Sequence, residues 1–337
     1  MKGKLLVTGA TGFLGTHLVE RLLSPGSAEP SRLRILARTA VPGMKERGVD
    51  VAPGSILDES ACAAALENVS AVFHLAGQVS RIPEDAALLY KVHVQGTAVL
   101  CRAAKKAGVD RIVLASTSGT IAVTETGETI PDESFAPPLK LMGGWPYYTS
   151  KLYQEETARR ECQGGPELVI LNPSLLLGPG DKRLSSTEDV LKLLASDIPV
   201  VPPGGVNFVD VRDAAAAFES ALSRGRSGER YLLGGPNWTF ETFFAKLSRI
   251  GGVKGPRIKL PDRIYSLAGK AVEAFYKQWD RTPPVDRVSV EMGQRFWWLD
   301  ASKAERELGF QARDPYETLY ETVAYIKKEF LSQAVLS

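Results

Sequence analysis

The sequence predicts an α/β fold in which helices cover both faces of a doubly wound parallel sheet. Two observations support this prediction: short apolar runs alternate with helical patterns through the first half of the chain, and a glycine-rich turn follows the first run. Crossovers between parallel strands are right-handed, and 337 residues are ample for the core of such a fold. The six buried strands that we expect are Leu5–Thr8, Leu33–Ala37, Val49–Ala52, Ala71–Leu75, Arg111–Ala115 and Leu168–Leu171.

The later half of the chain predicts a smaller domain interleaved with the first. Glycine and proline interrupt the regular layering after the sixth strand. Asn207–Val211 has the pattern of another buried strand and Asp213–Leu222 that of an alanine-rich helix, so we expect the chain to return to the first domain there. The expected division is a first domain over residues 1–178, with 206–233 returning to it, and a C-terminal substrate-binding region over 179–205 and 234–330.

Composition and charge favour a small-molecule partner. A formal net charge of +2 gives no electrostatic reason to bind nucleic acid or an acidic membrane. No apolar run reaches the roughly 18 residues of a membrane span, and no signal segment opens the sequence, so we expect a cytoplasmic protein, with peripheral membrane contact left open. The three cysteines lack metal-ligand spacing, so we expect buried, reduced thiols and no metal site; they are Cys62, Cys101 and Cys162.

A glycine turn between the first strand and a helix running to about Leu23 predicts a dinucleotide site, and hence a Rossmann-type sheet. Gly9 permits the tight turn, Gly12 lets the backbone approach a pyrophosphate, and Gly15 lets helix and strand pack closely, although the first two glycines stand one residue further apart than usual. The helix N-terminus suits phosphate, and a turn without a ligand is disfavoured because glycines cost backbone entropy. The expected contacts are Gly9, Thr11, Gly12, Phe13, Leu14 and Gly15.

The end of the second strand favours NADP(H), with NAD(H) as the alternative. An NAD site usually carries an acidic residue there for the ribose 2′-hydroxyl, whereas an arginine accommodates the 2′-phosphate of NADP. The acidic residue is missing, and Arg38 follows the strand. The other interpretation of Arg38 is a solvated loop cation.

Two further patterns indicate acid–base chemistry. Tyr147 and Lys151 are four apart in a helical pattern and therefore share one face, where an ammonium is expected to lower the pKa of the phenol. Thr117 lies in a hydroxyl cluster after the fifth strand, and parallel sheets bind ligands beyond the carboxyl ends of their strands. Each pattern alone is weak, since the spacing arises by chance and the cluster has the composition of an ordinary polar turn.

Together these residues give the chain a specific resemblance. It resembles the extended short-chain dehydrogenases/reductases, closest to the dihydroflavonol reductase and 3β-hydroxysteroid dehydrogenase branch. The similarity covers almost the whole chain but is sharp only to about Ala215. The motifs that carry it are Thr8–Gly15, Val72–Gly77, Ser116–Ser118, Tyr147 with Lys151, Leu171–Ser174, Gly178–Gly180 and Phe208–Asp213.

The resemblance implies roles for individual residues. Thr117 takes the place of the catalytic hydroxyl, Tyr147 that of the general acid/base and Lys151 that of its activator and of a contact to the cofactor. The other implied cofactor contacts are Arg38 at the 2′-phosphate, Ser55 and Ile56 on the adenine side, Ala76 and Gly77 beside the cofactor, and Pro173 and Ser174 at the nicotinamide.

Two residues depart from the family pattern. Ser55 replaces an acidic residue beside the adenine, and His93 replaces an asparagine, so the adenine contacts and any proton relay stay open. We favour His93 as a hydrogen-bonded core residue over a catalytic one. Sugar dehydratases of the family carry an Asp-Glu pair after the catalytic threonine; Ser118 and Gly119 stand there instead, which disfavours dehydration.

Apolar segments predict a hydrophobic substrate site. Leu139, Met142 and Trp145 before the tyrosine, and Leu177 after the sixth strand, are expected to form its wall; the alternative is that they only seal the core. Ile264–Trp279 has the pattern of an amphipathic helix, which we expect to pack on its own domain or a second subunit, with a substrate lid or a membrane contact as alternatives.

The expected function is that of an NAD(P)H-dependent ketone reductase or alcohol dehydrogenase. Its substrate would be a bulky, largely apolar ketone or alcohol: steroid-like, polyketide-like or a fatty 3-oxo compound. A nucleotide-sugar epimerase is the alternative. It would need groups that bind a diphosphate, for which the sequence offers only the pair Lys182 and Arg183. A non-catalytic dinucleotide-binding sensor is a second alternative, but it would have no need for Tyr147 and Lys151. We expect a monomer or a homodimer.

Overall fold

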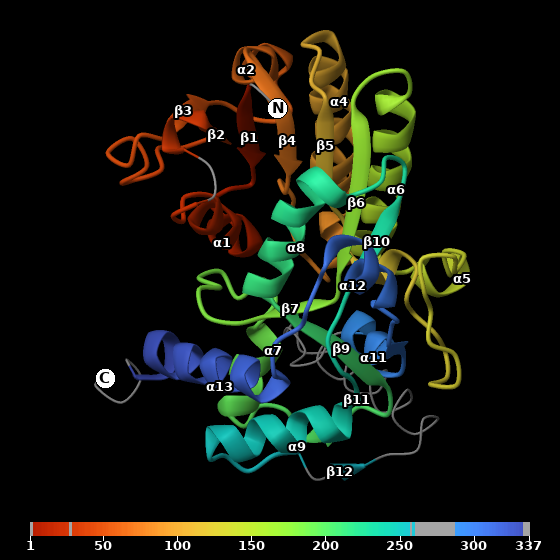
Figure 1. The fold of residues 1–337 in the computed structure, drawn as a ribbon. Helices are drawn as coiled ribbons and strands as arrows, with labels where there is room; N and C mark the ends of the chain where they lie inside the picture. Colours follow the sequence, from red (N-terminus) through yellow and green to blue (C-terminus); the bar gives the residue numbers. More distant parts are fainter. Residues whose placement is uncertain (1–2, 27–28, 257, 260–286, 333–337) are drawn as a thin grey trace.

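The first domain is built on a parallel sheet of seven strands. The computed structural model describes residues 3–26, 29–256, 258–259 and 287–332. The sheet order is β10-β6-β5-β4-β1-β2-β3, and all its neighbouring strands are parallel, which confirms the predicted fold class (Figure 1). The strands are β1 (Lys4–Thr8), β2 (Leu33–Ala37), β3 (Asp50–Pro53), β4 (Val69–His74), β5 (Arg111–Ala115), β6 (Glu167–Pro173) and β10 (Arg230–Leu233).

Helices cover both faces of this sheet. Residues alternate between faces along a strand, so that Leu5 and Val7 of β1 enter one core while Leu6 enters the other. The first core is closed by α1 (Phe13–Leu22), α8 (Val211–Arg224) and α12 (Ser302–Leu308). The second is closed by α2 (Glu59–Ala65), α4 (Gly96–Lys106) and α6 (Pro146–Cys162). The three cysteines lie in this second core and are free and buried, as expected.

A smaller sheet forms below the carboxyl ends of the main strands. Its central strand β9 (Gly205–Asp210) pairs with β7 (Leu175–Leu177), β11 (Asn237–Thr239) and β13 (Phe296–Trp297). The packed helices are α7 (Glu188–Leu194), α9 (Phe240–Gly251) and α13 (Pro315–Ile326). The shorter elements are α3 (Ala86–Tyr90), α5 (Leu139–Met142), α11 (Arg287–Gly293) and the pair β8 (Val200–Val201) and β12 (Ile258–Lys259).

The chain returns to the main sheet later than the sequence suggested. The strand expected at Asn207–Val211 is β9, which belongs to the smaller sheet and not to the seven-stranded one. Of the elements predicted to return over 206–233, α8 and β10 rejoin the first domain, whereas β9 is paired on both edges by β11 and β13. The predicted helix at Ile264–Trp279 lies outside the described residues. Among the described helices, none is both long and apolar enough to cross a bilayer.

A buried carboxylate on α6 ties this helix to the carboxyl ends of the strands. Oε1 of Glu155 accepts hydrogen bonds from Ser116 Oγ at 2.5 Å, Asn172 Nδ2 at 2.8 Å and Thr120 Oγ1 at 3.0 Å. Its Oε2 lies 3.1 Å from a guanidinium nitrogen of Arg230 on β10. A charge buried to this degree is stable only while its partners remain, so Glu155 fixes the segment that carries Thr117.

We expect Glu155→Gln to lower the free energy of unfolding by about 3 kcal/mol or more, because it leaves the buried side of Arg230 without a carboxylate. Chemical denaturation measures this. The matched control is Glu156→Gln, the exposed neighbour, which should change stability by less than about 0.5 kcal/mol. Equal effects of the two substitutions would contradict the role of Glu155.

Candidate active site

The glycine turn has the geometry that a tight strand-to-helix junction requires. Gly9 has φ +74°, and a Cβ atom there would lie 2.5 Å from the carbonyl carbon of Leu75 at the end of the neighbouring strand. A Cβ atom on Gly15 would lie 2.1 Å from the Gly9 oxygen. Both positions therefore admit only glycine, as the sequence predicted.

The N-terminus of α1 fits a phosphate group. Gly12 is its N-cap and provides no side-chain hydrogen bond, and the first turn has no acidic residue. The first N–H groups of the helix are thus left for an acceptor from outside, which the positive end of the helix dipole favours. Thr11 is exposed and Phe13 half-buried, whereas the side chain of Leu14 belongs to the core. Leu14 therefore offers only its backbone to a ligand.

The residues predicted on the adenine side differ in their burial and in their hydrogen bonds. Arg38 follows β2, is exposed, and has no hydrogen bond or ion pair to any described residue. Ser55 is half-buried, and its hydroxyl accepts the N–H of Leu57 at 3.2 Å. Ile56 is buried against Gly96, where a Cβ would come within 2.6 Å of its Cδ1. Arg38 is therefore available for a phosphate, while Ile56 chiefly completes the core.

The nicotinamide side contains an unsatisfied hydroxyl. Ser174 follows β6; its N–H donates to Leu233, but its buried Oγ has no hydrogen-bond partner among the described residues. A buried polar group of this kind is costly unless a ligand satisfies it. The preceding Pro173 is buried. After β4, Ala76 is half-buried and Gly77 is exposed. These residues fit a dinucleotide that extends from the glycine turn toward β6.

Lys151 lies at the end of β5, next to the hydroxyl cluster that contains Thr117. Its Nζ donates to the Ala115 carbonyl at 2.6 Å, at the end of β5, and to Oε1 of Gln154. Thr117 lies two residues beyond Ala115 and caps a short 3₁₀ turn, where its hydroxyl accepts the N–H of Gly119 at 3.4 Å. Burial lowers the pKa of Lys151 to about 7, against the opposing effect of Glu155.

Tyr147 lies one turn before Lys151 but differs from expectation in its acidity. Its pKa is raised, first by burial and then by Tyr148, whereas the sequence predicted that Lys151 would lower it. The Lys151 ammonium does not offset this effect, and its hydrogen bonds go to Ala115 and Gln154. The ring of Tyr147 meets His93 edge-on, with centroids 5.9 Å apart.

His93 is a hydrogen-bonded core residue, as favoured from the sequence. It is buried in a π-helical turn, Lys91–Gln95, between α3 and α4. Nε2 accepts the N–H of Gln78 at 3.1 Å, and Nδ1 lies 2.8 Å from Oγ of Ser150, which in turn donates to the Tyr147 carbonyl. Burial lowers the pKa of His93 to about 2, so the ring is neutral and holds the start of α6.

Sequence reasoning missed an aromatic surface beside the tyrosine. Tyr148 packs against Gly119, where a Cβ would lie 2.2 Å from the ring, and against Trp297, with centroids 4.9 Å apart. The sequence signal was only the Phe296–Trp298 run, since nothing local links Gly119 to Tyr148. The ring of Tyr148 thus occupies the space into which a side chain at position 119 would point.

Most residues of the predicted substrate wall are packed in the protein interior. Met142 and Trp145 are buried in a cluster with Val123, Leu152 and Trp297. Leu177 is buried in the core of the smaller sheet, and Leu139 is 64% exposed. Met142, Trp145 and Leu177 therefore fit the alternative, in which these side chains seal the core. Only Trp145 reaches the aromatic surface, 6.0 Å from Tyr148 between ring centroids.

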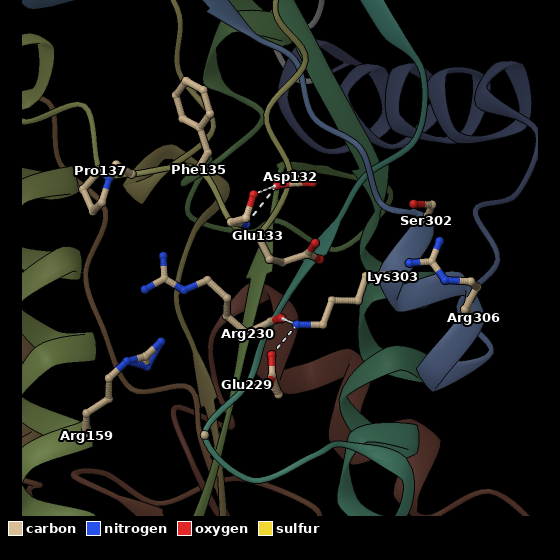
Figure 2. A pocket seen from close by; sticks show the side chains of 13 residues that line it. Asp132, Glu133, Phe135, Pro137, Arg159, Glu229, Arg230, Ser302, Lys303 and Arg306 are labelled. Carbon is tan, nitrogen blue, oxygen red and sulfur yellow. Dashed lines mark hydrogen bonds and ion pairs between the residues drawn. The ribbon is translucent and has the colours of Figure 1, made fainter.

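A separate cavity of about 620 Å³ lies beyond the edge strand β10 and has a charged lining. Figure 2 shows Arg159 and Arg230 on one side and Lys303 on the other, with Glu229 bound to Lys303. None of Tyr147, Lys151 or Thr117 lines it, so this cavity is not the site built above.

Comparisons with known proteins identify the family of the chain. A model of the family described as the NAD dependent epimerase/dehydratase family matches residues 5–234. A Synechocystis sp. protein provisionally named dihydroflavonol 4-reductase is 32% identical, over 95% of this chain and 94% of its own. Sterol demethylase protein B of Methylococcus capsulatus is 30% identical, over 96% and 98%.

A crystal structure, that of gox2253, superposes with a TM-score of 0.82 at 29% identity and covers 97% of this chain and 99% of its own. The family match spans β1 to β10, so it includes the glycine turn, Thr117, Tyr147 and Lys151. The chain therefore belongs to the NAD dependent epimerase/dehydratase family, within the extended short-chain dehydrogenases/reductases.

Proposed function

We propose that this protein is an NAD(P)H-dependent ketone reductase or alcohol dehydrogenase for a bulky, largely apolar substrate. The observation that carries the proposal is the bond from Lys151 to the Ala115 carbonyl, because it holds the helix of Tyr147 against the strand end that leads to Thr117. The names of the two relatives, a dihydroflavonol reductase and a sterol demethylase protein, support a ring-containing substrate.

The chain's own groups would carry the proton and orient the substrate. Burial raises the pKa of Tyr147, so its hydroxyl keeps its proton at neutral pH and serves as the acid that carbonyl reduction needs. Thr117 would hydrogen-bond the same substrate oxygen. The Lys151 ammonium donates to Ala115 and Gln154, but its positive charge, one helical turn away, would still stabilise the phenolate that remains. A bound nicotinamide dinucleotide would supply the hydride; the glycine turn would hold its pyrophosphate, and the Ser174 hydroxyl would contact its nicotinamide end.

The aromatic surface supports reduction over dehydration and offers an apolar wall. Dehydratases of the family would need an acidic side chain at position 119, where the ring of Tyr148 leaves no room. Tyr148, half-buried and packed on the buried Trp297, would offer an apolar contact to a planar or alicyclic substrate. The epimerase alternative is less well supported, because Lys182 and Arg183 are exposed on a loop.

We expect Tyr147→Phe to lower kcat by about 10²- to 10⁴-fold while NADPH still binds, because only the proton donor is removed. NADPH oxidation is followed with a panel of hydrophobic ketones and nucleotide sugars, and NADPH binding by fluorescence. Tyr153→Phe, an exposed tyrosine on the same helix, is the control and should keep wild-type turnover. Wild-type turnover in the Tyr147 variant would refute the mechanism.

The preference for NADP(H) is tested at Arg38. We expect Arg38→Gln to weaken NADPH binding by about 10- to 100-fold, the value of a lost charge-assisted hydrogen bond, and to leave NADH binding unchanged. Titration calorimetry with both cofactors measures this. Lys45→Gln removes an exposed charge from the segment between β2 and β3 and should change neither affinity. Equal losses for NADPH and NADH would remove the assignment of Arg38.

A further inference from the structure

A continuous chain of buried polar side chains connects Lys151 with the glycine turn. Lys151 donates to Gln154 Oε1, and Gln154 Nε2 donates to Thr97 Oγ1 at 2.9 Å. Thr97 Oγ1 lies 2.8 Å from Nε2 of His74, whose Nδ1 lies 2.8 Å from Oγ1 of Thr8. We call these five residues the buried chain. It crosses α6, α4, β4 and β1, and its four members other than Lys151 are completely buried.

Polar side chains at these four sites need a reason. The surrounding core is otherwise built from residues such as Leu6, Val72 and Leu100. Burying an amide, a hydroxyl and an imidazole there costs free energy that hydrogen bonds only offset, whereas aliphatic residues would stabilise the same layer directly. The buried chain ends at Thr8 Oγ1, which also accepts the N–H of Ala76 at 3.3 Å. Both of its ends therefore lie at residues of the proposed active site.

The charge of Lys151 gives the chain a direction. An ammonium only donates, so the amide oxygen of Gln154 faces it and the amide N–H groups point away. The Thr97 hydroxyl then accepts from the Gln154 amide. The hydroxyl proton of Thr97 can in turn be donated to Nε2 of His74. The reverse orientation would aim two N–H groups at Thr97. With hydrogen bonds running in this direction, the neutral His74 ring carries its proton on Nδ1 and donates to Thr8.

The surroundings of Lys151 leave few groups that balance its charge. Burial lowers the pKa of Lys151, and Glu155, on the same helix, raises it by a smaller amount. His74 from β4 and His93 from the π-helical turn both face the ammonium and are neutral, since their pKa values are lowered to about 3 and about 2. Tyr147, one turn earlier, keeps its proton because its pKa is raised. Among the described residues, Ala115 and Gln154 receive hydrogen bonds from the ammonium.

We propose that Gln154 is a positioning residue: through Thr97 and His74 it holds the Lys151 ammonium at the end of β5 and couples it to the Thr8–Ala76 side of the cofactor site. Gln154 does not touch substrate or cofactor in this role. The inference rests on the proposed function, because it assigns Lys151 the task of stabilising the Tyr147 phenolate.

Two substitutions of Gln154 test the role in opposite directions. Gln154→Glu adds a carboxylate beside the ammonium, so the alkaline limb of the pH profile of kcat/KM should move up by about 1 pH unit or more. Gln154→Met removes the acceptor, so the limb should move to lower pH. Gln163→Glu, at the exposed end of α6, adds the same charge and should leave the limb in place. A merely structural Gln154 would displace it in neither direction, and that result would overturn the proposal.

A second measurement does not depend on turnover. The sequence has three histidines, so ¹⁵N-histidine labelling of the cofactor-free wild-type protein gives a spectrum that single substitutions can assign. We expect His74 to stay neutral from about pH 5 to 9, with the proton on Nδ1. A proton on Nε2 would reverse the chain and refute the proposal. If instead Tyr147→Phe kept full turnover while His74 showed the expected tautomer, the reaction mechanism would fail and the buried chain would stand.

Discussion

The burial of one ammonium group organises this site. Lys151 is 5% exposed, and a charge so placed must find acceptors within the protein. The Ala115 carbonyl can serve because it ends β5, where the sheet ladder no longer uses every backbone oxygen. Satisfying the lysine therefore draws α6 onto the carboxyl edge of the sheet, and Tyr147 comes with it. The buried carboxylate of Glu155, one turn further on, fixes the same helix to β6 and β10.

Much of the first domain was predictable because its signals are local. Strands buried on both faces are continuous apolar runs, and each of the six predicted strands overlaps a strand of the main sheet. The glycine turn was recognisable because Gly9 and Gly15 are excluded from any other identity by backbone atoms within 3 Å of where a Cβ would lie. The spacing of Tyr147 and Lys151 followed from helical geometry alone.

The expectations that the structure does not support share a different cause: each depends on contacts that the local sequence does not show. β9 looks like any buried strand, and only its pairing with β11 and β13 assigns it to the smaller sheet. Met142 and Trp145 have the apolar character of a substrate wall, but Trp297, far away in sequence, covers them. The acidity of Tyr147 was misjudged because burial raises the pKa of its phenol, and because Lys151 donates its hydrogen bonds to Ala115 and Gln154.

The contact between Tyr148 and Gly119 restricts how this chain could evolve. Any side chain at position 119 would collide with a ring 2.2 Å from its first carbon, and that ring is itself held by Trp297. A single replacement of the glycine by an acidic residue would damage the protein before it conferred a new chemistry. Divergence toward dehydration therefore requires two substitutions in a fixed order. A smaller residue has to replace Tyr148 before an acidic residue can replace Gly119.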